Sequence, residues 1–317
     1  MSDAASHATG NTYEDEIDYE LNITSRYPLR DYTDNPLNEE SVMPFVGALC
    51  GNINSSSNVV YVQDVFQMPK MHHFICTGAK GQYVYGTVLT MFEPEQQNIT
   101  QDFNKSISEG SASQEYYVPK CLVLLSQHGY LMEFREFLTN LYRISTIPSN
   151  LPLERYIVNF CSEIQRPDPG EYSVQYTPST FPNPLIFTTP PHNLPLALCP
   201  RVITNEFAAN PTNTLFRVLG VENIVTVWEA LALERQVLLV SSSVSLLAIV
   251  GEAFLSLLFP LQWSHVYIPL LPQIATTILS APVPYFCGVH RDVLPSALMD
   301  MVRDIAFVGL HVDVMND

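Results

Sequence analysis

Apolar runs rich in β-branched and aromatic residues predict strands in the first third of the chain. Three such runs occupy residues 59–66, 72–77 and 82–92, and their residue types favour strand over helix. Gly78-Ala79-Lys80-Gly81 separates the second run from the third, and glycine adopts the positive φ that a tight hairpin turn needs. We therefore expect these last two strands to pair antiparallel.

A fourth strand and a helix complete the first predicted unit. Residues 93–115 are polar and follow neither the helical nor the strand period, which predicts a surface loop. The run CLVLLS at residues 121–126 predicts a buried strand, and the apolar positions from Leu131 to Tyr142 repeat at helical spacing. The expected unit is a small antiparallel sheet backed by a helix.

The second half of the chain changes character twice. A second amphipathic helix is predicted over residues 152–164, and the many prolines of residues 166–212 then predict irregular chain with at most edge strands. From Leu215 onward, predicted helices such as residues 221–234 and 245–259 alternate with short, uninterrupted apolar runs. This alternation predicts a parallel sheet covered on both faces, so the expected fold class is α/β.

Charge narrows the range of partners. The chain has 32 acidic and 15 basic residues and a formal charge of −17, which disfavours binding to nucleic acid or anionic lipid. Residues 1–41 hold ten acidic residues and two arginines, so we expect a solvated, disordered arm over residues 1–43. The apolar run at residues 246–261 contains Glu252 and Pro260, which favours a buried helix over direct membrane insertion.

The N-terminal sequence and the cysteines indicate the compartment. Residues 1–20 lack the basic and apolar regions of a signal peptide, and the six cysteines are spread singly without metal-ligand spacing. We expect a cytoplasmic protein without a metal or cofactor.

Motifs that could carry covalent chemistry are weak. The loop at residues 78–81 lacks the spacing of a phosphate-binding loop. Ser241-Ser242-Ser243 favours a helix N-cap over a nucleophile. Adjacent His72 and His73 should point to opposite faces of a strand, which favours a hydrogen-bonded or exposed pair over metal binding. Glu234-Arg235 favours helix capping over partner binding, and Trp263 favours core packing over a partner anchor. We predict no covalent active site.

Five phrases in the second half carry a family resemblance. In order, they are Leu219-Gly220-Val221-Glu222-Asn223, Leu233-Glu234-Arg235, Phe259-Pro260-Leu261-Gln262-Trp263, His265-Val266-Tyr267-Ile268-Pro269 and Ala281-Pro282-Val283-Pro284-Tyr285. Together they resemble the central portion of the DENN family, and residues 72–89, 117–144 and 152–164 resemble upstream parts of the same family.

The resemblance implies an architecture of two lobes. It implies a longin-like first lobe over residues 44–146 (antiparallel sheet plus helix) and a doubly wound α/β second lobe over residues 147–317, closed by a strand within residues 308–314. The family's helical downstream portion is expected to be absent after Asp317, and a helical partner is the expected substitute.

The resemblance also implies a function. Relatives are guanine-nucleotide exchange factors for Rab GTPases in vesicle trafficking, which need no general base or nucleophile. The alternatives are a non-catalytic GTPase-binding adaptor and a GTPase-activating factor, for which Arg135, Arg143 and Arg291 would be the candidate arginines. The candidate contact residues, in the groove between the lobes, are Asn223, Gln262 and His265; the alternative role for them is hydrogen bonding within the fold.

Overall fold

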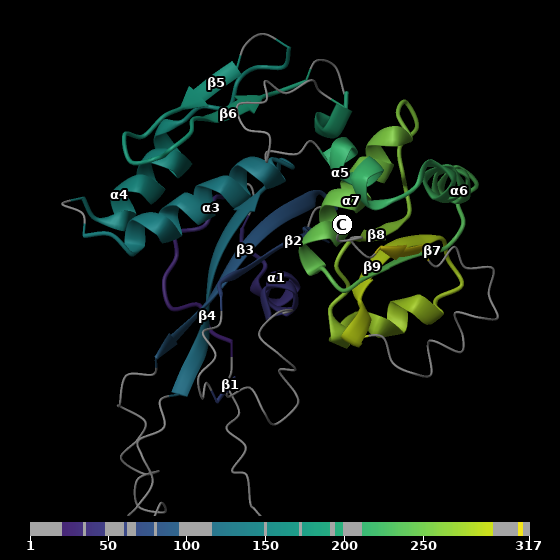
Figure 1. Ribbon diagram of the computed structural model, residues 1–317, viewed down its shortest axis with the longest axis horizontal. Helices are drawn as coiled ribbons and strands as arrows, with labels where there is room; N and C mark the ends of the chain where they lie inside the picture. The colour runs from purple at the N-terminus through teal and green to yellow at the C-terminus, as the bar shows by residue number, and fades with distance from the viewer. Residues whose placement is uncertain are drawn as a thin grey trace, which may run out of the picture.

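Within the described residues, two four-stranded sheets of different type lie side by side, and a small two-stranded sheet accompanies the first of them (Figure 1). The first sheet is antiparallel and the second is parallel, with helices on both, so the expected α/β class is confirmed. This computed structural model describes residues 21–33, 36–47, 60–61, 68–78, 81–94, 116–148, 151–170, 173–190, 194–198, 211–293 and 310–312.

The first sheet has the strand order β1-β4-β3-β2. Its strands are β1 (Val60–Tyr61), β2 (Lys70–Thr77), β3 (Tyr83–Pro94) and β4 (Tyr116–Ser126). The predicted hairpin joins β2 and β3: Gly81 has φ of +79° and its N–H donates to the Gly78 carbonyl at 3.0 Å. The antiparallel pairing expected from this turn is confirmed, with Phe74 opposite Gly86.

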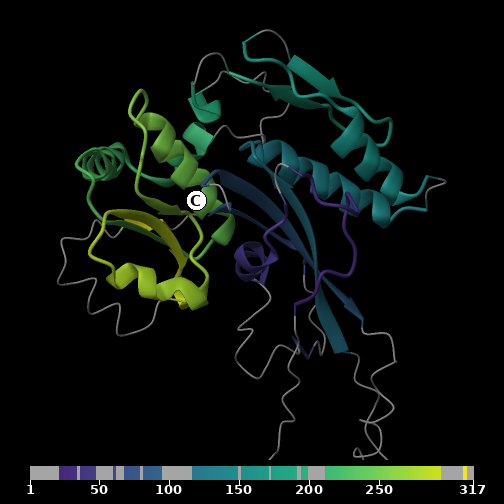
Figure 2. The same cartoon turned by 180° about the vertical axis from the view of Figure 1, so that it is seen from behind.

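An aromatic core covers one face of this sheet. Helix α3 (Leu131–Ser145) packs on it together with α4 (Leu153–Val158), the π-helical turn η2 (Asn159–Glu163) and the hairpin of β5 (Ser173–Tyr176) and β6 (Leu185–Thr188). Phe137 and Phe160 stack with ring centroids 3.8 Å apart. The expected lobe boundary after residue 146 separates α3 from α4 in sequence, whereas the two helices share this core (Figure 2).

The second sheet has the order β10-β7-β9-β8, and each neighbouring pair in it is parallel. The run from α5 to β10 comprises α5 (Pro211–Val218), α6 (Val221–Ala232), β7 (Val237–Ser241), α7 (Val244–Leu257), β8 (Val266–Ile268), the 3-10 helix η4 (Gln273–Ser280), β9 (Tyr285–His290), the short η5 (Arg291–Val293) and β10 (Leu310–Val312). Strand β10 falls inside the predicted closing segment. A further 3-10 turn, η3 (Leu196–Leu198), precedes α5.

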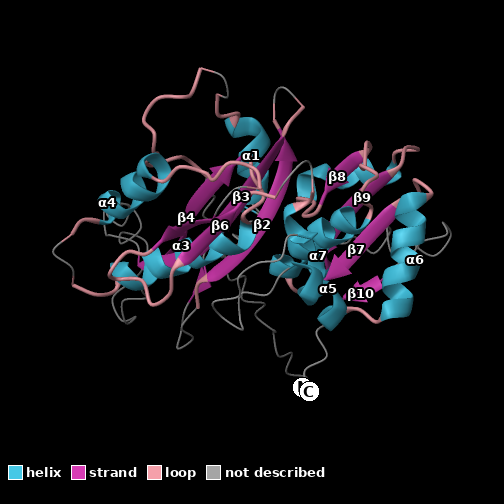
Figure 3. Ribbon diagram, turned by 90° about the horizontal axis from the view of Figure 1, so that it is seen from above, coloured by secondary structure: helices cyan, strands magenta, loops and turns pink. Residues whose placement is uncertain are grey.

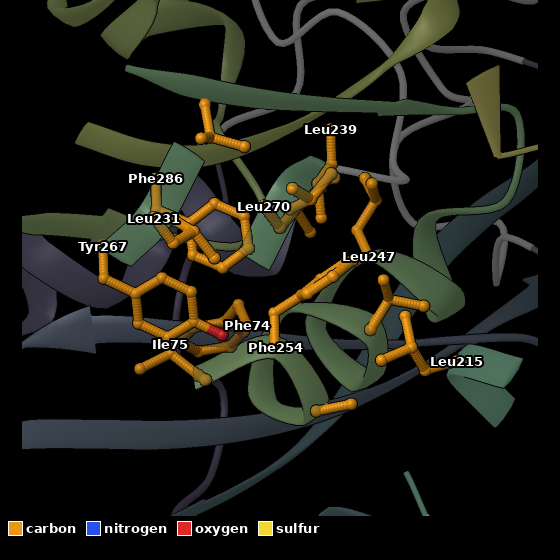
Figure 4. Close-up of a cluster of buried hydrophobic side chains, with 14 of the residues drawn as sticks. Phe74, Ile75, Leu215, Leu231, Leu239, Leu247, Phe254, Tyr267, Leu270 and Phe286 are labelled. Atoms are coloured by element: carbon orange, nitrogen blue, oxygen red, sulfur yellow. The ribbon is translucent and has the colours of Figure 1, made fainter. Parts of the chain in front are cut away.

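One hydrophobic core spans both sheets. Phe74 and Ile75 of β2 are fully buried in the same cluster as Phe254 of α7 and Phe286 of β9, as Figure 4 shows. Tyr83 of the first sheet meets Tyr267 of β8 edge to face, with ring centroids 6.1 Å apart. Helix α7 lies between the two sheets (Figure 3).

The folded chain begins earlier than the sequence predicts. Helix α1 spans Glu39–Val46 and buries Val42 and Val46 in the shared core, so the expectation that residues 39–43 belong to a disordered arm is wrong. Glu39 and Glu40 occupy the first turn, where carboxylates stabilise the helix N-terminus. The charge of these residues therefore indicates the start of a helix. The disorder expected for residues 1–20 concerns a segment outside the described residues.

Candidate functional site

The amino ends of the parallel strands bring three connections to one edge of the second sheet. These are residues 233–236 before β7, 258–265 before β8 and 281–284 before β9. Gln236 Nε2 donates to the carbonyls of Ala281 and Val283 at 2.8 and 3.1 Å, and Glu234 Oε2 lies 3.3 Å from His265 Nε2. We call the exposed residues of these connections, together with Val266, the amino-edge surface.

Apolar side chains dominate this surface although it faces solvent, and its charged members, Glu234 and Arg235, lie in the connection before β7. Leu233, Phe259, Leu261, Val266 and Val283 are between 37% and 62% exposed. Residues 258–265 and 281–284 contain no Asp, Glu, Lys or Arg. Interface cores are depleted in charge and enriched in aromatic residues, and clustered exposed apolar side chains mark interaction sites. The arrangement suits protein binding.

Glu234 closes helix α6 in a conformation that glycine usually occupies. Its φ is +53°, the Glu234 N–H donates to the Leu231 carbonyl at 3.0 Å, and the Arg235 N–H donates to the Ala230 carbonyl at 2.9 Å. This pair of bonds is a Schellman cap, so the predicted capping role of Glu234-Arg235 is confirmed. A side chain in this left-handed conformation costs about 1 kcal/mol, and such strain gathers at functional sites.

Trp263 fixes the position of His265. Its ring packs against the shared core, its Nε1 donates to the Val266 carbonyl at 3.2 Å, and it meets the His265 ring edge-on with centroids 5.2 Å apart. The prediction that Trp263 packs on the core is therefore confirmed. Trp263 on one side and Glu234 on the other hold the half-buried imidazole at the surface.

The structure brings two of the three predicted contact residues together. Gln262 is exposed on the connection before β8, three residues from His265. Asn223 lies in the first turn of α6, and the nine residues from it to Ala232 rise roughly 14 Å. Helix α6 lies on the side of the second lobe away from the first (Figures 1 and 3), so the groove between the lobes is the wrong location for Asn223. Partner binding by all three residues stays a prediction.

Sequence reasoning missed the apolar members of the surface. Leu233, Phe259, Leu261 and Val283 resemble core residues by type, and each adjoins a buried strand or helix. The available signal was the lack of charged residues in two connections that must lie at a sheet edge. The candidate arginines of the activating alternative lie elsewhere: Arg135 and Arg143 on α3, and Arg291 at the start of η5.

Two adjacent histidines are buried in the first sheet. His72 Nε2 lies 2.9 Å from the Phe45 carbonyl oxygen, and His73 Nδ1 lies 3.0 Å from Thr87 Oγ1. Burial lowers the pKa of His72 to about 4 and that of His73 to about 3, so both rings are neutral. Of the two roles that the sequence favours, the hydrogen-bonded pair is the one observed, because each ring has a hydrogen-bond contact and neither is exposed.

A partly buried acid lies near the junction of the two sheets. Burial raises the pKa of Glu252 in α7 to about 7, and the Tyr267 hydroxyl opposes the rise. The charge of Glu252 in turn raises the pKa of Tyr85, after the larger effect of burial. Tyr85 and Tyr267 belong to the core that joins the lobes. Their interaction with Glu252 therefore indicates a role in the stability of the fold.

The carboxyl end of β7 carries hydroxyl groups. Ser243 occupies the N-cap position of α7, as predicted, and its N–H donates to Ser241 Oγ at 3.0 Å. His290 Nε2 lies 2.9 Å from the Ser242 carbonyl oxygen, so this ring nitrogen is hydrogen-bonded to the backbone. The contacts at this edge hold the connection in place.

The described residues hold neither a metal cluster nor a membrane-spanning helix. No cluster of three or more His, Cys, Asp or Glu in the described ranges is arranged to hold a metal ion. None of the helices within those ranges has the length and apolar character needed to cross a bilayer.

Two family models match the chain. The model of the DENN (AEX-3) domain matches residues 117–313, and that of the uDENN domain matches residues 22–91. The DENN match runs from β4 of the first sheet to β10 of the second, and the uDENN match covers α1 through most of β3.

Proposed function

Because the chain belongs to the DENN family, whose members are typically exchange factors for Rab GTPases, we propose that it promotes GDP/GTP exchange on a Rab-type small GTPase. The observation that carries this proposal is the extent of the matches: residues 22–91 and 117–313 include strands of both sheets. Both lobes of the framework are therefore those of the family, and they share one core.

Exchange needs binding energy and no covalent chemistry. A nucleotide held at picomolar affinity is bound by about 16 kcal/mol, and each tenfold weakening requires about 1.4 kcal/mol of coupling. Coupling is reciprocal, so a factor that weakens nucleotide binding must itself bind the nucleotide-free GTPase more tightly than the loaded one. A rigid apolar surface is a suitable source of that energy.

We place the GTPase contact on the amino-edge surface. Leu261 and Phe259 supply exposed apolar area, and Gln262 and His265 supply polar groups beside it. The nearby Glu234 keeps a left-handed backbone conformation and lies 3.3 Å from His265. The proposed cellular setting is the cytoplasm, with recruitment to vesicle membranes through partners.

The test is release of fluorescent GDP from a panel of purified Rab GTPases. The chain should accelerate release from at least one of them. Leu261→Glu should reduce that acceleration about tenfold, because a charge would enter the apolar contact. The matched control is Ile274→Glu, which also replaces an apolar side chain by a carboxylate, at a residue that is 73% exposed in η4 and outside the amino-edge surface; it should retain the wild-type rate.

The outcomes separate the proposed function from its alternative. Binding to a Rab without faster release across the whole panel would assign the chain as an adaptor. If both variants lose the acceleration equally, the GTPase contact is not at the amino-edge surface. The exchange function itself, shown by the wild-type chain, would still stand.

A further inference from the structure

Helix α6 has two apolar faces, and only one of them is covered. Ile224, Val227 and Leu231 are buried against the sheet, and at about 100° per residue they occupy an arc of roughly 60°. Val221, Val225 and Trp228 are 63%, 54% and 41% exposed, and they fall in a second arc of similar width. We call Val221, Val225 and Trp228 the α6 stripe; its arc lies roughly a quarter turn from the buried one.

Trp228 is held in place at the end of the stripe. Its indole Nε1 donates to the Leu257 carbonyl at the last residue of α7, at 3.0 Å. That bond lays the ring along the end of α7 while leaving part of the ring in solvent. A large aromatic side chain fixed at a surface is a common anchor of protein interfaces.

The stripe has the dimensions of a helix-binding site. Its members are spaced i, i+4 and i+7, and the twelve residues of α6 extend about 18 Å. Ridges formed by residues four apart on one helix fit the grooves of another at an axis separation of about 8–10 Å. Three turns of a second helix would therefore cover the stripe along its length.

The charged residues beside the stripe indicate whether the partner helix is acidic or basic. Glu222 and Glu229 lie beside the stripe on its solvent side, roughly 70–90° from its centre on the helical wheel, and the sequence of α6 contains no Lys or Arg. The whole chain carries a formal charge of −17, which attracts a basic partner at long range and opposes association of two copies.

We propose that the α6 stripe is a docking site for an amphipathic helix of a partner protein, in which lysine or arginine residues adjoin the apolar positions. Apolar contacts to Val225 and Trp228 supply the centre of the interface, and Glu222 and Glu229 pair with the basic residues at its rim. The three residues of the stripe are distinct from those of the amino-edge surface, and Trp228, at the end nearest that surface, bonds to Leu257 just before it.

The first experiment uses the protein's own fluorescence. The chain has two tryptophans, so Trp263→Phe leaves Trp228 as the reporter. The probe is a synthetic 18-residue helical peptide with leucine at i, i+4, i+7 and i+11 and lysine at the adjoining positions. Binding should shift the Trp228 emission to shorter wavelength and reduce its quenching by acrylamide. A peptide with glutamate in place of lysine should bind at least about tenfold more weakly.

The second experiment places the peptide on the stripe. Val225→Glu should weaken binding of the lysine peptide about tenfold, because it puts a charge at the apolar centre, while glutamate is a better helix former than valine. The control Thr226→Glu adds the same charge one residue away, on the exposed side of α6, and should bind the lysine peptide at least as tightly as the wild type.

Three results would overturn the proposal. The first is no binding of the lysine peptide by the wild-type chain. The second is equal weakening by Val225→Glu and Thr226→Glu. The third is a concentration-dependent doubling of mass in light scattering that Val225→Glu abolishes, which would assign the stripe to a second copy of this chain.

Discussion

Burial of ionisable side chains makes the stability of this protein depend on pH. His72 and His73 are both fully buried in β2, and Arg135 adds to the effect of burial in lowering the pKa of His73. Glu252 is a carboxyl group whose pKa is raised to about 7. The two kinds of group act in opposite directions with pH.

The histidines should destabilise the fold in mild acid. Their pKa values are about 4 and 3 in the folded state against about 6.5 when unfolded, so the unfolded state takes up protons first. Stability is fully present above pH 6.5 and falls as the pH drops toward 4, by up to about 1.4 kcal/mol per pH unit for each histidine. Urea denaturation of the wild type and His73→Gln at pH 7.5 and 5 checks this. An unchanged difference between the two pH values in His73→Gln would contradict it.

Glu252 has the reverse effect. Its folded pKa of about 7 exceeds the unfolded value of about 4.3, so its contribution is most favourable below pH 4 and is lost as the pH rises through 7. Glu252→Gln should therefore raise the free energy of unfolding by roughly 1–3 kcal/mol at pH 8 and by much less at pH 5. Thermal melts at both pH values measure the difference. The exposed Glu229→Gln should change little at either.

At the level of single elements, close contacts fix how β9 meets its surroundings. A Cβ on Gly288 would overlap the Pro269 carbonyl oxygen, and the Leu271 N–H donates to the Gly288 carbonyl at 2.7 Å. The two atoms closest to that Cβ belong to the Pro269 backbone, so no side-chain rotation can relieve the overlap. Glycine at this position lets β9 and the segment after β8 approach each other.

Gly288→Ala should therefore lower the free energy of unfolding by about 3 kcal/mol, the upper end of the cost of overpacking a core. Gly220→Ala is the matched control, because a Cβ there meets no atom within 4 Å. Its effect should stay within about 0.5 kcal/mol. Chemical denaturation of the two variants side by side tests the contrast, and equal effects would contradict it.

The sequence predicts the elements that have a clear hydrophobic period and misses those that begin with helix-breaking or charged residues. Strands β2 and β3, helix α3 and the parallel strands were expected from their apolar patterns. Helix α5 was missed because Pro211, which ends a proline-rich segment, is its first helical residue, a position where proline is well tolerated. Whether Leu261 or Val225 is exposed depends on which other elements pack over it. The local sequence pattern does not contain that information.

At the scale of the molecule, the shared core ties the stability of the two lobes together. Val88 and Phe74 of the first sheet belong to the same buried cluster as Leu239 and Phe254 of the second. Dividing the chain between the lobes would expose both sets of side chains.

The described chain should therefore unfold in one cooperative transition. Trp228 and Trp263 both lie in the second lobe, so their fluorescence follows that lobe, whereas far-UV circular dichroism follows both sheets. The two signals should give the same midpoint in urea. A separate, later or earlier step in the dichroism would show that the lobes unfold independently.

The packing of α7 between the sheets also has a mechanical consequence. A partner that binds the second lobe does not have to close a hinge against the first, so little of its binding energy is used to order this protein. When an exchange factor and a GTPase bind, the more flexible of the two proteins deforms more. With a stiff body on this side, the strain would fall on the GTPase, at the loops that hold its nucleotide.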